Sequence, residues 1–154
     1  MKIKLSSTSF LLPNNKSWEF LEKNQNINFG EYGDFIKDLN YKSKSKVDIL
    51  ILFLPDLIDY ISTNQFEEKS EFKKILNIIQ LIEKRLKNND NSLIISLSEF
   101  LFYNLVNFSK NYRSTKRFKN FFIEKLYELS KKFKNLYILD LDEIFSEYGY
   151  NRCF

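Results

Sequence analysis

The chain has 154 residues and a formal net charge of +4, with 44% hydrophobic and 29% charged residues. These values are typical of a soluble globular domain, so we expect residues 1–154 to form a single domain. The sequence has no histidine, which excludes a Ser-His-Asp triad, a Cys-His pair and a His-ligated metal built within this chain. Its one cysteine, Cys153, excludes an internal disulfide and a multi-cysteine metal site.

Two features bear on where the protein works. The most apolar stretch, Ile49 to Leu54, is much shorter than the roughly 20 residues that a membrane helix needs. The apolar run Phe10 to Leu12 is too short for a signal-peptide core. We therefore expect a cytoplasmic protein with no membrane partner and a reduced thiol.

Strand-like and helix-like segments alternate from the N-terminus onward. Strands are predicted over residues 2–6 and 27–29, and short helices over residues 17–23 and 34–39. The serine-rich run that begins at Ser6 ends the first strand.

The middle of the chain carries the strongest signals. Residues 47–54 (VDILILFL) are apolar apart from Asp48, which is typical of a strand buried on both faces of a parallel sheet. Residues 67–87 form the clearest predicted helix, because apolar side chains recur at spacings of three and four. That stripe comprises Phe72, Ile75, Leu76, Ile79, Ile82 and Leu86.

The last third repeats the alternation. We expect a strand over residues 92–97, a connection over 98–115, a helix over 116–132, a strand over 136–139, and a final helix from Asp140 that Gly149 closes. Strands that alternate with helices predict an α/β fold of three layers, with a five-stranded, mostly parallel sheet in the flavodoxin-like order 2-1-3-4-5. Ligands of such sheets bind at the carboxyl ends of the strands.

That rule selects the candidate site residues. Ser6 ends the first strand, where hydrolases of the SGNH type carry their nucleophile, and Ser7 follows it as a candidate ligand contact. The remaining candidate ligand contacts are Gly33, Asp56 and Ser98. Each also has a purely structural interpretation: the serines can satisfy turn amides, Asp56 can cap a turn or steady the Ser6 loop, and Gly33 can supply a positive φ.

Two charged runs need a separate interpretation. Carboxylates from Asp140 to Glu143 look like Mg²⁺ ligands, but acidic residues are also favoured in the first turn of a helix, so no metal site is predicted. The run Lys110 to Lys119 is the most concentrated basic segment. Lysines elsewhere are interleaved with acids, so a nucleic-acid partner is not expected, and a solvated helix entrance is the favoured interpretation.

Taken in order, four segments resemble the N-terminal SGNH-hydrolase-like domain of the FkbH-like proteins, which belong to the HAD superfamily. The segments are KLSSTSF, FGEYGDFIKDLN, KVDILILFLPDLIDY and LYILDLDEIFSEYG. The matching motifs are Leu5-Ser6 at the end of strand one, Tyr32-Gly33 after strand two, Asp56-Leu57 near the end of strand three, and Leu139-Asp140-Leu141, which ends the last strand and leads into the last helix. The resemblance covers most of the chain.

The resemblance implies a specific role. Family members carry a HAD catalytic domain after this one, with an aspartate nucleophile and Mg²⁺, and load a glyceryl unit onto an acyl-carrier protein in polyketide or surface-glycan synthesis. The HAD signature Asp-x-Asp-x-Thr, the SGNH asparagine and the terminal Asp-x-x-His block are missing from this sequence. We therefore expect an incomplete SGNH-like module, from a fragment or a truncated gene. It would be non-catalytic and without a cofactor of its own, with a HAD domain or a carrier protein as partner.

Two alternatives stay open. The chain is an SGNH-type esterase or acyltransferase if Ser6 is completed by a histidine beyond Phe154. It is an anion-binding or nucleic-acid-binding module if the run Lys110 to Lys119 contacts phosphate.

Overall fold

The computed structural model describes residues 2–8, 26–30, 35–40, 44–53, 57, 68–98 and 112–148. Their elements are β1 (Ile3–Ser7), β2 (Ile27–Phe29), α2 (Phe35–Asn40), β3 (Val47–Phe53), α4 (Glu68–Asn88), β4 (Ser92–Ser98), α6 (Tyr112–Lys132), β5 (Leu136–Leu139) and α7 (Leu141–Tyr148). The predicted helix over residues 17–23 and the predicted cap at Gly149 lie outside the described residues.

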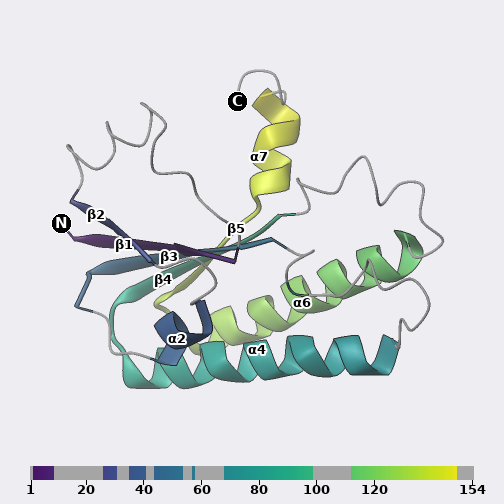
Figure 1. Cartoon of the computed structure of the whole chain (residues 1–154), viewed down its shortest axis with the longest axis horizontal. Coiled ribbons are helices and arrows are strands. Elements are labelled where there is room, and N and C mark those ends of the chain that lie inside the picture. The colour runs from purple at the N-terminus through teal and green to yellow at the C-terminus, as the bar shows by residue number, and fades with distance from the viewer. Residues whose placement is uncertain are drawn as a thin grey trace.

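The strands form one five-stranded sheet in the order β2-β1-β3-β4-β5, and every neighbouring pair is parallel. Helices α2, α4 and α6 lie on one face of this sheet and α7 lies on the other (Figure 1). The prediction of a three-layer α/β fold in the flavodoxin-like order is thus confirmed.

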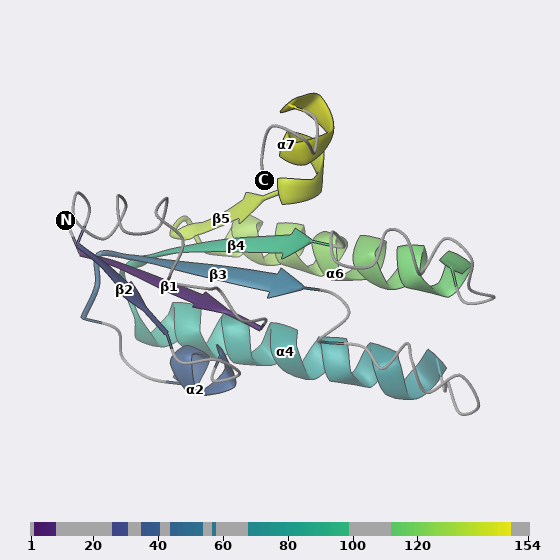
Figure 2. The ribbon, with the colours of Figure 1, turned by 45° about the horizontal axis from the view of Figure 1, so that its top comes forward.

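The hydrophobic core lies between the sheet and helices α4 and α6 (Figure 2). Alternation along the strands points one set of side chains at these helices. The set comprises Leu50, Leu52, Leu93, Ile95, Leu97 and Leu136, all buried. Phe118 and Phe122 of α6 and Ile75 and Ile82 of α4 meet them and are fully buried. This packing fixes the strand ends relative to one another, and with them the candidate site residues.

The expectation that β3 is buried on both faces is wrong. Buried and partly exposed residues alternate strictly along the strand. Leu50 and Leu52 face the helices and are buried, whereas Ile49 and Ile51 face the α7 side and are half-buried. The sequence pattern is uniform because β-branched and aliphatic residues fill both faces, but the two faces differ in how much of the protein packs on them.

Helix α6 begins at Tyr112, four residues before the predicted start at Lys116. Polar residues in this stretch suggested a connection, but no glycine or proline interrupts it, so the helix extends through them. Most of the other described elements agree with their predicted bounds to within a residue. Among the described helices, none is both long and apolar enough to cross a membrane.

Candidate functional site

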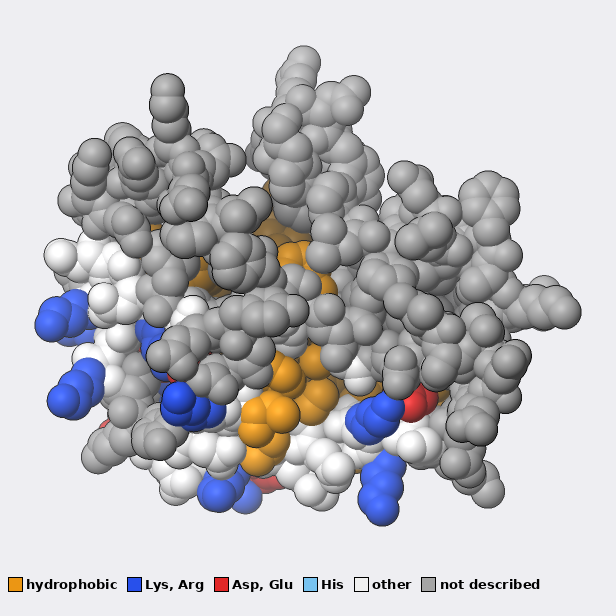
Figure 3. All heavy atoms as spheres, viewed as in Figure 1, with side chains coloured by type: hydrophobic (Ala, Val, Ile, Leu, Met, Phe, Trp, Pro, Cys, Tyr) orange, Lys and Arg blue, Asp and Glu red, His pale blue; other side chains and the backbone are white. Residues whose placement is uncertain are grey.

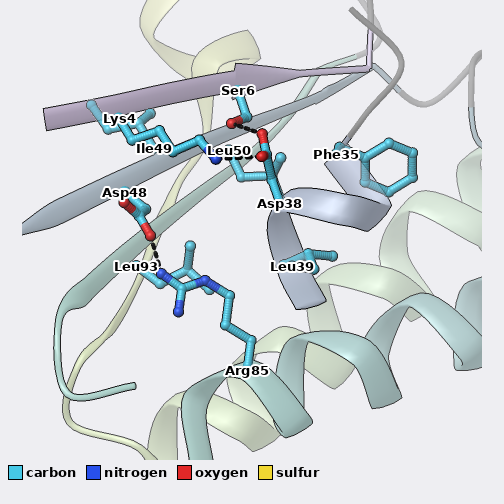
Figure 4. Close-up of a pocket in the computed structure, with 10 residues that line it drawn as sticks. All are labelled: Lys4, Ser6, Phe35, Asp38, Leu39, Asp48, Ile49, Leu50, Arg85 and Leu93. Atoms are coloured by element: carbon cyan, nitrogen blue, oxygen red, sulfur yellow. Dashed lines mark hydrogen bonds and ion pairs between the residues drawn. The ribbon is translucent and has the colours of Figure 1, made fainter. Parts of the chain in front are cut away.

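The first candidate residue, Ser6, lies near the carboxyl end of β1 and is buried. Alternation turns its side chain toward α2, where its Oγ donates a hydrogen bond to Asp38 Oδ2 at 2.5 Å. The ammonium of Lys4, two residues earlier on the same face of β1, forms an ion pair with the other oxygen of Asp38. Figure 4 shows this group between β1 and α2. The carboxylate of Asp38 therefore accepts from both side chains.

Gly30, just after β2, covers this group from the side. Its amide donates to the Leu5 carbonyl at 2.7 Å. A Cβ placed on Gly30 would lie 2.6 Å from Asp38 Oδ2 and 2.7 Å from Ser6 Oγ, closer than real Cβ contacts allow. The backbone of Gly30 therefore packs against the hydroxyl of Ser6, and a side chain at this position would have to displace the ends of the Ser6 and Asp38 side chains.

A second charged group lies on the same face of the sheet, nearer the amino ends of the strands. Asp48 of β3 forms an ion pair with Arg85 of α4, which is almost fully buried (Figure 4). Asn91 joins them, donating to Asp48 Oδ2 at 2.9 Å and accepting from Arg85 at 3.1 Å. Each polar group in this cluster is thus compensated inside the core, as a buried charge requires.

Between the two groups lies a cavity of about 20 Å³, lined by Lys4, Ser6, Phe35, Asp38, Leu39, Asp48, Ile49, Leu50, Arg85 and Leu93. That volume accommodates about one water molecule. A substrate acyl group does not fit in it. The cavity therefore has no room for an ester on this side of Ser6. The charged residues in its lining form two ion pairs, Lys4–Asp38 and Arg85–Asp48, and the charges within each pair neutralise each other.

The ends of β1 and β3 are joined where ligands of such folds usually bind. The amide of Thr8 donates to the Ile51 carbonyl at 3.1 Å. The amide of Phe53 donates to Thr8 Oγ1 at 2.9 Å. Ser7 is buried and, by alternation, faces the side of the sheet opposite to Ser6. The two candidate serines therefore do not share one site.

A third polar group lies at the carboxyl ends of β4 and β5. Ser98 is fully buried, and its Oγ donates to Asp142 Oδ1 of α7 at 2.7 Å. Lys119 of α6 pairs with the other oxygen of Asp142 at 2.7 Å. Ser96 lies two residues earlier on the same face of β4 and is fully buried as well. Within the described part of the chain, Ser96 Oγ has no hydrogen-bond partner.

The acidic run at the start of α7, from Asp140 to Glu143, does not fit a magnesium site. Asp140 Oδ1 accepts the amide of Glu143 at 3.1 Å, which is a helix cap. Asp142 is occupied by Ser98 and Lys119. No group of three or more histidine, cysteine or acidic side chains among the described residues is placed to hold a metal ion.

The structure describes only some of the remaining candidate residues. Gly33 and Asp56 lie outside the described residues. In the basic run, the side chains described are those of residues 117–119: Arg117 is exposed, Phe118 belongs to the core and Lys119 binds Asp142. Ser98 lies at the carboxyl end of β4, as predicted, and its side chain is hydrogen-bonded to Asp142 of α7.

Sequence reasoning missed Asp38, the acid that binds Ser6, and Arg85, the base that binds Asp48. A signal for both was present. Asp38 falls on the apolar stripe of α2 with Phe35 and Leu39, and Arg85 falls three residues after Ile82 on the stripe of α4. A charged residue on a buried stripe needs a partner of opposite charge.

Comparison with known proteins gives one informative result. No family model matches the chain. No curated protein matches it either. Among solved structures, it is similar to the N-terminal part of the protein BF1531 from Bacteroides fragilis, described as containing a phosphatase domain and complexed with Mg, at a TM-score of 0.67 and 15% sequence identity. The match covers 97% of this chain and 43% of that one, so the chain spans less than half of its neighbour. At this identity the likeness shows the fold.

Proposed function

We propose that this chain is a non-catalytic, SGNH-like N-terminal module of an FkbH-like HAD protein, which positions a phosphatase domain and docks an acyl-carrier protein. Two findings support the proposal. The fold is shared over 97% of the chain with the N-terminal part of a protein that contains a phosphatase domain. The shared part is 43% of that structure, which leaves room in the neighbour for a further domain.

The observation that carries the non-catalytic role is the state of Ser6. A serine nucleophile needs a base that takes its proton and an open approach for the substrate carbonyl. Ser6 is buried, its hydroxyl is bound to Asp38, and the backbone of Gly30 packs against it. The charge of Asp38 is compensated by Lys4, so the group is suited to tying α2 to β1.

The chemistry then belongs to the partner domain. In this proposal the Mg²⁺ and the nucleophilic aspartate lie in the HAD domain, consistent with the poor fit of Asp140 and Asp142 to a metal. The module serves a reaction that loads a glyceryl unit onto a carrier protein, in polyketide or surface-glycan synthesis.

Hydrolysis assays test the absence of catalysis. The purified chain and its Ser6→Ala variant are incubated with p-nitrophenyl acetate and with p-nitrophenyl phosphate, with and without Mg²⁺. We expect both proteins to match the rate of buffer with either substrate. Ester hydrolysis that Ser6→Ala abolishes would favour the esterase alternative and overturn the non-catalytic role.

Binding assays test the docking role. The chain is titrated calorimetrically with a holo acyl-carrier protein and with the separately prepared phosphatase domain of BF1531. Saturable binding to either partner supports the proposal, and no heat with both contradicts it. Binding to an oligonucleotide that weakens steeply with salt would instead favour the basic run Lys110 to Lys119 as the functional surface.

A further inference from the structure

The outer edge of β5 is open in the described part of the chain. β5 pairs with β4 on its inner side, and no described strand lies beyond it. Its sequence, LYIL, contains none of the charges, prolines or bulges that usually protect an edge strand. An apolar edge strand of this kind is a template for pairing with another strand.

The backbone groups on this edge can be identified from the register. The carbonyl of Asn135 accepts from Leu93 of β4, so residues 135, 137 and 139 direct their backbone groups inward. Leu136 and Ile138 direct theirs outward. The amide of Leu136 is used by the Phe133 carbonyl. The carbonyl of Leu136 and both backbone groups of Ile138 therefore face the open edge.

Exposed apolar side chains lie on both sides of this edge. On the α7 face, Tyr137 is 54% exposed and Leu139 is 37% exposed. On the other face, the outer flank of α6 carries Tyr127, which is 56% exposed, and the partly buried Ile123. Ile123 and Tyr127 follow Lys119 at spacings of four, so they share the flank from which Lys119 reaches α7. Phe121, on the opposite flank, contacts Phe72 of α4.

We propose that this edge, formed by β5 and the outer flank of α6, is a self-association surface at which two copies of the chain pair β5 with β5. The two strands run antiparallel about a two-fold axis at Tyr137 and join the sheets into one of ten strands. Such an isologous contact uses the same residues twice and closes after two copies. Ile138 of each copy donates its amide to the Leu136 carbonyl of the other.

Charge complementarity favours a second copy as the occupant. With Tyr137 opposite Tyr137, the residues that flank the strand meet as Lys134 opposite Asp140, once on each side of the axis. The outer surface of α6 has a depression of about 450 Å³, and its lining includes charges of both signs, from Glu124, Glu128 and Lys131. Two α6 helices related by the same axis run antiparallel, which lets a glutamate of one depression approach Lys131 of the other copy.

The first test is the mass of the chain in solution. Sedimentation velocity from micromolar to near-millimolar concentration is expected to show a shift from the 18.6 kDa monomer toward twice that mass. A monomer throughout this range would overturn the proposal.

A matched pair of substitutions locates the surface. Tyr137→Lys places two ammonium groups against each other at the axis and is expected to raise the dimer dissociation constant at least tenfold, about 1.4 kcal/mol. Leu76→Lys introduces the same side chain at a residue of α4 that is 40% exposed, and is expected to leave association unchanged. Equal effects of the two variants, with circular dichroism showing both folded, would place the contact elsewhere and overturn the proposal.

Charge exchange tests the register. Lys134→Asp and Asp140→Lys should each weaken association, and the double variant should restore it because the opposed pairs are rebuilt with reversed sign. Asp140→Lys also removes the hydrogen bond from the Glu143 amide to Asp140 that caps α7. The double variant lacks the same cap, so if loss of the cap caused the weaker association, the double variant would stay weak and would not recover. Failure of the double variant to recover would contradict the Tyr137 register.

Cross-linking gives an independent readout. In an antiparallel pair, directly opposed residues outside the hydrogen-bonded positions have Cα atoms about 4.5 Å apart, which a disulfide can span. In a Cys153→Ser background, Tyr137→Cys should oxidise to a covalent dimer, whereas Leu76→Cys should stay monomeric on a non-reducing gel. A Tyr137→Cys chain that does not cross-link would overturn the pairing.

Discussion

The two faces of the sheet are built from similar apolar residues, but they differ in how deeply those residues are buried. On the face covered by α4 and α6, the side chains of β3 and β4 are buried, with Leu52 and Ile95 fully so. On the α7 face, Ile49, Ile51 and Ile94 are half-buried, and Tyr137 is largely exposed. Among the described residues, the face covered by α4 and α6 supplies most of the burial that stabilises the fold. In the view of Figure 3, the hydrophobic side chains that can be seen lie near the middle of the molecule, with lysine and arginine side chains on either side of them.

Polar groups follow the same division. The covered face holds charges that compensate each other, in the Asp48–Arg85 pair and in the Lys4–Asp38 pair. The α7 face holds the hydroxyls of Ser96 and Ser98, and Ser98 is bound to Asp142, whose charge is compensated by Lys119. The most deeply buried ion pair, Asp48–Arg85, lies on the covered face. A buried charge without a partner costs more than a buried hydroxyl, so the covered face is the more sensitive to single substitutions.

The largest effect is expected from Arg85→Met. It leaves Asp48 as an uncompensated charge in the core and should lower the free energy of unfolding by about 3–5 kcal/mol, measured by urea denaturation. The double variant Arg85→Met/Asp48→Leu removes both charges and should recover most of that loss. A single variant as stable as the parent would show that the pair does not hold the covered face.

Truncation of one leucine on each face compares them directly. Leu52→Ala opens a cavity at a fully buried position and should cost about 2–5 kcal/mol. Leu139→Ala changes a residue on the α7 face that is already 37% exposed. It should cost about 1 kcal/mol, because this side chain buries less apolar area in the folded state than Leu52 does. Guanidinium unfolding of the two variants gives the difference, and equal losses would contradict the division of the faces.

The two serines of β4 provide a finer comparison within the α7 face. Ser98→Ala removes a donor to Asp142 and should cost about 1–2 kcal/mol. Ser96→Ala removes a buried hydroxyl that has no partner among the described residues, so it should be neutral or stabilising by up to about 1 kcal/mol. Thermal unfolding of both variants measures the order, and a larger loss at Ser96 would contradict it.

The smallest effect is expected at the exposed surface of α6. The hydrogen bond from Lys125 lowers the pKa of Glu128 below its ordinary value. Since the pKa of the folded state is the lower one, the pair stabilises the helix above the ordinary glutamate pKa, and this contribution is lost as pH falls through the lowered pKa. A carboxyl NMR titration should show the lowered midpoint, and Lys125→Met should raise it. An unchanged midpoint in that variant would show that Lys125 is not the cause.

Local patterns were sufficient to predict most of the described elements. The stripe of α4 and the apolar runs of β3, β4 and β5 locate those elements because periodicity is a property of neighbouring residues. The position of Ser98 at a strand end followed in the same way. The partners of Ser6 and Ser98 could not be predicted from local patterns, because Asp38 is 32 residues from Ser6 and Asp142 is 44 residues from Ser98 in sequence.

The sequence by itself determined the α/β alternation, the parallel sheet and the placement of serines at its carboxyl edge. Only the tertiary structure decided that β3 is buried on one face rather than two, that Ser6 is held by Asp38 next to Gly30, and that Asp142 binds Ser98 and Lys119. The physical reason is that periodicity and capping act over a few residues, whereas burial and ion pairing depend on which distant segments pack together.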